Sequence, residues 1–240
     1  MSQVEGRNPV KASIQNGKVK HLLVNKQTRN SKKVLEIIRL ATKGNVPVEY
    51  VAKDRLEKES ETGRHQGVIG YLSKVSYASI EDILAKDKRD LCLVLLDKVQ
   101  DPQNLGSILR TGAATGVDAV VIPRKSSVGL TPAVRRAAMG GDTVVPVVQG
   151  SLHRVVKTLK DEGFTVIGVD GSARIDIYSE RLTGAVAFIL GGEHHGLAEQ
   201  IIDKCDSVVR IPMSQQASSL NVGVAAAVVL YERVRQQGKI

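Results

Sequence analysis

An uninterrupted apolar run, LCLVLL at residues 91–96, constrains the fold of this 240-residue chain more than any other feature. A strand without polar residues on either face is typical of a parallel sheet whose two faces are both covered by helices. Further strands are expected at 118–122, 144–148, 165–169, 185–190 and 208–211. The helical patterns between them predict an α/β domain with a mainly parallel sheet.

Helices are expected where apolar residues recur at helical spacing. Asn104 is expected to cap the first helix, and Gly116 to end it. A later helix is expected to begin near Ser218 or Ser219, because a serine before an apolar run is an N-cap signal. The full set of expected positions after Gly116 is 133–139, 152–162, 197–204 and 220–231.

The first 75 residues show a second, smaller alternation of strands and helices. Strands are expected at 20–24, 46–51 and 68–72, with helices at 31–43 and 54–59. Residues 76–90 contain a short helical pattern and then a charged linker. The sequence therefore predicts a small α/β domain at 1–75, a linker at 76–90 and a larger α/β domain at 91–240.

The composition indicates a cytoplasmic protein. The chain contains no run of about 18 uncharged apolar residues, so no membrane partner is expected. Its first residues, MSQVEGRNPVKA, lack the apolar centre of a signal peptide. Cys92 and Cys205 both lie among apolar residues, which indicates buried, reduced thiols.

Almost all of the excess positive charge lies in the first third of the chain. Residues 1–75 carry 15 Lys and Arg against 7 Asp and Glu, a net charge of +8 out of +9 for the whole chain. Such a segment favours a phosphate-rich partner, although a solvated basic face is the simpler alternative. With 3% aromatic residues, stacking on single-stranded bases is not the expected mode of binding, and a folded RNA fits better.

Three loops follow strands of the larger domain, at 97–104, 191–196 and 212–219. Ligands of open parallel sheets bind beyond the carboxyl ends of the strands, so these loops are candidates for one site. The first loop contributes Asn104 and, almost two helical turns later, Arg110. The second contains Gly191, Gly192 and Glu193, and the third supplies hydroxyls and leads to Asn221.

Other ligand classes are disfavoured by missing motifs. The chain has no G-x-G-x-x-G after its first strand and no G-x-x-x-x-G-K-[ST], which disfavours a dinucleotide site and a P-loop. No metal is expected, because the Glu193-His194-His195 sequence has no spaced partner ligands. A hydrolase using Ser218 or Ser219 with His194 is an alternative, but no G-x-S-x-G elbow supports it.

Three motifs lie along the larger domain: NLGSILRTGAATG at 104–116, ILGGEHHGL at 189–197 and IPMSQQASSLNVGVAAAVVLYE at 211–232. Together they resemble the SpoU/TrmH branch of the SPOUT RNA methyltransferases. They occur in the family's order and span most of residues 91–235. GRNPV at 6–10 and RHQGV at 64–68 further resemble the subgroup that carries an N-terminal substrate-binding domain and methylates a guanosine of large-subunit ribosomal RNA.

The resemblance implies a C-terminal domain with a deep trefoil knot, S-adenosyl-L-methionine as cofactor and a homodimer that completes the site. It implies cofactor binding by Gly191, Gly192, Ile211, Met213, Ser219 and Leu220, and a reactive surround of Asn104, Arg110, Glu193, Ser219 and Asn221. Arginine side chains rarely give up a proton, so a phosphate clamp is the safer role for Arg110 than that of a base. The alternatives are a tRNA or resistance-type rRNA 2′-O-methyltransferase and a non-catalytic RNA-binding protein of ribosome assembly.

Overall fold

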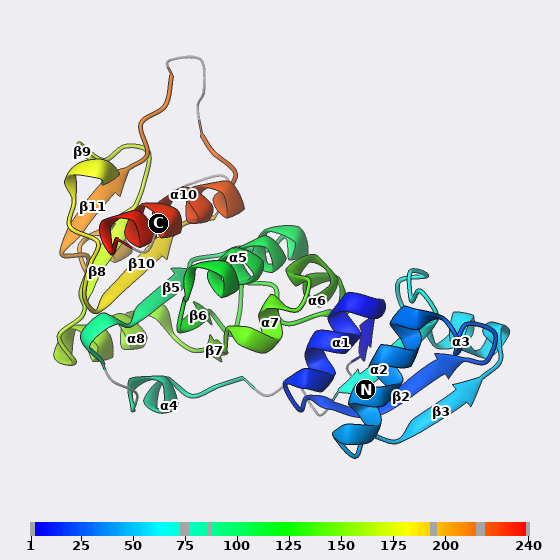
Figure 1. Ribbon diagram of the computed structural model, residues 1–240. Coiled ribbons are helices and arrows are strands. Elements are labelled where there is room, and N and C mark those ends of the chain that lie inside the picture. Colours follow the sequence, from blue (N-terminus) through cyan, green and yellow to red (C-terminus); the bar gives the residue numbers. More distant parts are fainter. Residues whose placement is uncertain (1–2, 73–76, 86–87, 193–195, 215–218, 239–240) are drawn as a thin grey trace. The chain divides into compact units, whose positions relative to one another are not determined.

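The computed structural model describes residues 3–72, 77–85, 88–192, 196–214 and 219–238. Backbone contacts divide the chain into two compact units, whose elements Figure 1 labels. The first unit comprises Met1–Ser76 together with Leu130–Val144, and the second comprises Tyr77–Gly129 and Val145–Ile240. Within the described ranges, no helix has both the length and the apolar character needed to span a bilayer.

A four-stranded mixed sheet forms the centre of the first unit. Its strands are β1 (Gln3–Glu5), β2 (Val19–Asn25), β3 (Val48–Val51) and β4 (Val68–Leu72), in the order β1-β4-β2-β3. Strand β4 is antiparallel to both of its neighbours, and β2 is parallel to β3. The sequence pattern located β2, β3 and β4 but missed β1, because three residues are too few to show a period.

Helices cover both faces of this sheet. Helices α1 (Arg7–Gln15) and α2 (Lys32–Lys43) contribute apolar residues to one core cluster, and α3 (Lys53–Glu59) contributes Leu56 to another. In α2, Val34, Ile37 and Ala41 are buried at helical spacing and Ile38 is partly buried, in agreement with the helix predicted at 31–43. The basic residues of α2 remain on its exposed side, so the helix is anchored by one face and presents charge on the other.

The buried carboxylate of Glu5 fixes the loop that precedes β4. It accepts hydrogen bonds from Gln3 Nε2 at 2.7 Å, Ser60 Oγ at 2.8 Å and the Glu61 backbone N–H at 2.7 Å, and a further one from the Thr62 hydroxyl. Burial raises the pKa of Glu5, but the hydrogen bonds outweigh it and hold the pKa below its usual value of 4.5. Glu5 is therefore ionised and fully partnered in the folded unit.

Seven parallel strands form the sheet of the second unit. They are β5 (Cys92–Leu96), β6 (Ala119–Ile122), β7 (Val147–Gln149), β8 (Thr165–Val169), β9 (Ile175–Asp176), β10 (Val186–Leu190) and β11 (Ser207–Arg210). Their order is β7-β6-β5-β10-β8-β11-β9, and each pairing is parallel. The predicted α/β class with a mainly parallel sheet is confirmed. The trefoil knot that the resemblance implies stays a prediction.

The central strands of this sheet are covered on both faces. Helices α4 (Ile80–Leu84), α8 (Leu152–Asp161) and α9 (Glu199–Ile202) share one core cluster with Leu93 and Leu95 of β5. The intervening residue Val94 is also buried, as expected for an uninterrupted apolar strand. Helices α5 (Pro102–Thr115) and α10 (Val222–Gln236) pack against each other and lie side by side in Figure 1.

Two capping predictions are wrong. Asp101 caps α5, because its carboxylate accepts a hydrogen bond from the Gln103 N–H at 2.8 Å, and Asn104 lies inside the first turn. Asn221 and not Ser219 caps α10, since its Oδ1 accepts from the N–H groups of Gly223 and Val224, and Ser218 lies outside the described residues. Gly116 ends α5 in a left-handed conformation at φ 75°, as predicted.

Leu130–Val144, part of the segment between β6 and β7, folds with the first unit. It forms α6 (Pro132–Ala138) and α7 (Gly141–Val144), so the strand expected at 144–148 begins only at Val147. Pro146 precedes that strand and cannot continue a helix. Asn16 Nδ2 donates to Thr143 Oγ1 at 2.7 Å, and Lys18 Nζ donates to the Asp142 carbonyl at 3.1 Å. The boundaries predicted at 75 and 91 stay predictions.

The hydrogen bonds of Glu5 predict that the variant Glu5→Gln is destabilised by about 1–3 kcal/mol at pH 7, because donors that faced a charge face a neutral amide. The pKa of Glu5 is lower in the folded than in the unfolded chain. Its stabilisation is therefore fully present above about pH 4.5 and is lost as the pH falls through the folded-state pKa. Urea unfolding of both proteins at pH 7 and at acidic pH should show the difference shrinking on acidification.

Glu36→Gln is the matched control for this measurement. Glu36 is exposed and pairs with Lys11 Nζ at 2.6 Å, so its replacement should change the free energy of unfolding by less than about 0.5 kcal/mol. An effect of Glu5→Gln that is equally large at both pH values would contradict the role assigned to the charge.

Candidate active site

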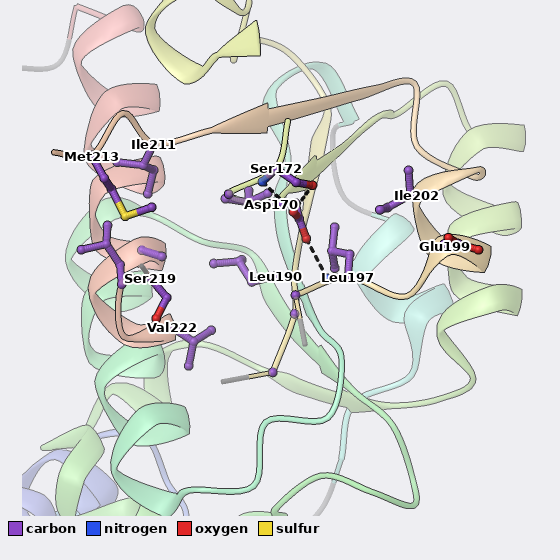
Figure 2. A pocket seen from close by; sticks show the side chains of 17 residues that line it. Asp170, Ser172, Leu190, Leu197, Glu199, Ile202, Ile211, Met213, Ser219 and Val222 are labelled. Carbon is purple, nitrogen blue, oxygen red and sulfur yellow. Dashed lines mark hydrogen bonds between the residues drawn. The ribbon is translucent and has the colours of Figure 1, made fainter. Parts of the chain in front are cut away.

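A cavity of about 700 Å³ opens beyond the carboxyl ends of β8, β10 and β11. Figure 2 shows side chains from the loops that follow these three strands and from the start of α10 pointing toward it. The lining consists of Val169, Asp170, Gly171, Ser172, Leu190, Gly191, Gly192, Gly196, Leu197, Glu199, Ile202, Ile211, Met213, Ser219, Leu220, Val222 and Ala225. Its position agrees with the rule that ligands of parallel sheets bind at this edge.

Glycine is required in the loop after β10 because the backbone folds closely on itself there. A Cβ on Gly191 would lie 2.2 Å from the carbonyl oxygen of Gly196, and Gly192 and Gly196 form an antiparallel bridge. A Cβ on Gly192 would lie 3.0 Å from the carbonyl oxygen of Lys98, in the loop after β5. These contacts leave backbone rather than side chains at this wall of the cavity.

Asp170 ties the loop after β8 to the loop after β10. Its carboxylate accepts hydrogen bonds from the Leu197 N–H at 2.9 Å, the Ser172 N–H at 2.9 Å and Ser172 Oγ at 2.7 Å, as drawn in Figure 2. Burial raises the pKa of Asp170, but these hydrogen bonds more than compensate, so its pKa lies below the usual value. The carboxylate is therefore a fixed negative charge at the cavity.

The loop after β11 supplies the opposite wall. Ile211 and Met213 line the cavity on the way out of the strand, and Ser219 and Leu220 line it on the way into α10. Figure 2 shows the Met213 thioether and the Ser219 side chain on this side. The cavity thus combines apolar walls with hydroxyl and carboxylate groups, which suits a ligand that has both apolar and polar parts.

An amide pair connects α5 to the start of α10. Asn221 Nδ2 donates a hydrogen bond to Asn104 Oδ1 at 2.8 Å, and Asn104 is buried. Gly223 follows at the point of closest approach, where a Cβ would lie 2.2 Å from Ser107 Oγ. The structure therefore brings the predicted residues Asn104 and Asn221 together, outside the lining of the cavity.

The remaining predicted site residues have different positions. The six residues predicted to bind a cofactor, Gly191, Gly192, Ile211, Met213, Ser219 and Leu220, all line the cavity. Arg110 is exposed on α5 and is not part of the lining. Glu193 and the alternative base His194 lie outside the described residues. The roles of these residues stay predictions.

Sequence reasoning missed Asp170 and Ser172. The strand at 165–169 was predicted. The rule that ligands bind beyond the carboxyl ends of parallel strands would therefore also have pointed to residue 170. It was passed over because no recognised motif marks that loop. For metals, the described ranges contain no group of three His, Cys, Asp or Glu side chains suited to an ion.

Family models match both parts of the chain. The SpoU rRNA Methylase family matches residues 91–231, and the family described as RNA 2′-O ribose methyltransferase substrate binding matches residues 3–78. The chain is 36% identical to 23S rRNA (guanosine-2′-O-)-methyltransferase RlmB of Pseudomonas syringae pv. tomato, over 99% of this chain and 98% of that protein. The RlmB protein of Vibrio cholerae is also 36% identical, over 87% of this chain and 86% of that protein.

A solved structure resembles nearly the whole chain. It is the SpoU methyltransferase AviRb from Streptomyces viridochromogenes in complex with AdoMet, which matches with a TM-score of 0.84 and 26% identity over 99% of this chain and 91% of that one. The resemblance inferred from the three motifs is thereby confirmed. Since the family model covers more than half of the chain, the chain belongs to the SpoU rRNA methylase family and is an RNA 2′-O-methyltransferase.

Proposed function

We propose that this chain transfers a methyl group from S-adenosylmethionine to the ribose 2′-hydroxyl of a guanosine in 23S ribosomal RNA. The substrate is the one named for the RlmB relatives, which match this chain over most of its length. The observation that carries the proposal is the cavity at the carboxyl ends of β8, β10 and β11, lined by all six residues expected to hold the cofactor.

The residues of the cavity fit this cofactor. The close approach of Gly191 to Gly196 leaves a backbone wall, and Leu190, Ile211 and Leu220 offer apolar surface for an uncharged ring system. Ser219 adds a hydroxyl for polar groups. When bound, S-adenosylmethionine supplies a methyl group on a positively charged sulfur, which is already a strong electrophile.

The protein's contribution is mainly to position the hydroxyl. A ribose 2′-hydroxyl reacts only when it is aligned with the methyl group and water is excluded, and alignment alone can account for a large part of a rate enhancement. Arg110 is exposed on α5, almost two helical turns beyond Asn104 of the Asn104–Asn221 pair, so it can reach an RNA phosphate. We assign Arg110 the role of a phosphate clamp. Asn104 and Asn221 shape the protein surface around the reacting hydroxyl.

The RNA-binding role is assigned to residues 1–75, and methyl transfer to residues 91–240, with 76–90 as the linker. Residues 6–35 contain no Asp or Glu but eight Lys and Arg. Lys32 and Lys33 are exposed in the first turn of α2, where positive charge is unfavourable for the helix itself. An anionic partner would offset this cost, and RNA phosphates fit such a partner.

We further propose that the enzyme is a cytoplasmic homodimer. The exposed side of α10 carries Val224 and Tyr231, whose exposed fractions are 50% and 47%. Leu220, just before the helix, is 38% exposed. Large apolar side chains gathered along one helix favour a protein partner, and a second copy of the chain would bring its own groups to the cavity. The cytoplasmic location follows from the proposed ribosomal substrate.

Arg110→Ala should reduce the single-turnover rate of methyl transfer by about 100-fold or more, because the hydroxyl loses its alignment. Binding of S-adenosylmethionine, measured by calorimetry, should stay unchanged, since Arg110 is outside the cavity lining. Arg110→Lys keeps the charge but loses the planar fork, so a bidentate phosphate contact should be largely abolished. Wild-type rates in the alanine variant would rule out the clamp.

Lys32→Gln combined with Lys33→Gln should weaken binding to a 23S rRNA fragment and lower the salt dependence of the affinity. Removing one lysine–phosphate interaction should reduce the slope of log K against log salt by about 0.7–0.9. The control is Arg154→Gln combined with Lys157→Gln, two exposed cations on α8. Equal changes in slope for the two double variants would show that general charge, and not this surface, binds the RNA.

A further inference from the structure

The cavity is acidic, although the protein is basic. Among the described residues that line it, Asp170 and Glu199 carry negative charge and none is Lys, Arg or His. The chain as a whole has a formal net charge of +9. An acidic lining in a basic protein indicates that the ligand of this cavity carries positive charge, whereas the proposed RNA substrate is a polyanion.

Asp170 is held at a fixed position in this lining. Its carboxylate accepts the three hydrogen bonds from Leu197 and Ser172, and its own N–H donates to the Val209 carbonyl at 2.9 Å. A Cβ on Gly196 would lie 2.3 Å from Asp170 Oδ2, so a side chain at position 196 would displace the carboxylate. The charge is thus preorganised and needs no rearrangement when a ligand binds.

The three hydrogen bonds neutralise no charge. They come from two backbone N–H groups and a hydroxyl, and among the described residues Asp170 forms no ion pair with Lys or Arg. An ionised carboxylate in this state attracts a cationic ligand more strongly than one already paired with Lys or Arg. Asp170 therefore discriminates between a cationic and a neutral ligand better than a carboxylate in an ion pair would.

We propose that Asp170 is a specificity-determining residue that makes the cavity prefer the methyl donor, whose sulfur is positively charged, over the product, whose thioether sulfur is neutral. The inference rests on the proposed use of S-adenosylmethionine. Donor and product differ only by the methyl group and the positive charge on sulfur, so a fixed negative charge stabilises the donor selectively. Methyl transfer removes the positive charge from the sulfur, and this loss favours release of the product.

The alternative is that Asp170 only shapes the cavity. A purely structural carboxylate would position Leu197 and Ser172, and its removal would weaken donor and product by the same factor. The ratio of the two dissociation constants separates the two roles, because damage to shape cancels in the ratio while removal of a charge does not.

The test is calorimetric titration of wild-type protein and Asp170→Asn with S-adenosylmethionine and with S-adenosylhomocysteine. We expect the preference for the donor over the product to fall about three- to tenfold in the variant, as for a single partly screened charge. Equal weakening of both ligands, or an unchanged ratio, would overturn charge selection and leave the cofactor proposal standing. If neither ligand bound wild-type protein, the proposed function itself would fail.

Asp206→Asn is the matched control. Asp206 accepts a hydrogen bond from the Val166 N–H at 2.8 Å and pairs with Lys160 at 2.7 Å in the same unit, outside the cavity lining. Its replacement should leave the ratio at the wild-type value even if stability falls. A similar drop in the ratio for Asp206→Asn would show that the effect is not specific to Asp170.

Wild-type protein provides a second measurement if Asp170→Asn does not fold. Sinefungin carries a protonated amine near the position of the sulfonium, whereas S-adenosylhomocysteine carries a neutral thioether there. Charge selection predicts that sinefungin binds at least about threefold more tightly, with a smaller advantage at high salt because ions screen the carboxylate. Equal affinities at low salt would overturn the proposal.

Discussion

The close backbone contact between Gly191 and Gly196 is the constraint on which the candidate site depends. A side chain at position 191 would collide with the Gly196 carbonyl, and one at position 196 would collide with the Asp170 carboxylate, which holds the loop by accepting the Leu197 N–H. Strand β10 carries this loop into the sheet between β5 and β8. Because parallel strands end at the same edge, the loops after β8, β10 and β11 meet, and their meeting point is the cavity.

The start of α10 combines a structural and a functional role in one side chain. Asn221 Oδ1 accepts the N–H groups that begin the helix, while Nδ2 donates to buried Asn104. Both atoms of the amide are thus used, which fixes its orientation. Ser219 and Leu220 lie directly before this cap, so the start of α10 positions one wall of the cavity. Gly223 has no side chain, which allows α10 to approach Ser107 of α5 closely.

The sequence alone predicted the elements with strong periodicity and the loops that carry motifs. The parallel sheet followed from LCLVLL at 91–96, and the six expected cofactor residues line one cavity. Caps were less predictable, because Asp101, Asn104, Ser219 and Asn221 are all good N-cap residues and only three-dimensional contacts choose among them. Asp170 was missed because no motif marks its loop, and its contact with Leu197, 27 residues away, appears only in three dimensions.

The basic first third of the chain and the acidic residues of the cavity match the opposite charges of the two ligands that such an enzyme binds. A ribosomal RNA is a polyanion and is attracted by the basic residues of the first third of the chain, whereas the methyl donor carries positive charge at the reacting sulfur. Carboxylates on an RNA-binding surface would repel phosphates, but in a cavity they act mainly on what enters it, since screening limits their range to about 8 Å at physiological salt. Asp170 can therefore favour a cation locally without cancelling the attraction for RNA. The hydrogen bonds from Leu197 and Ser172 keep that charge ionised and in place, so the contacts that shape the cavity also set its electrostatic preference.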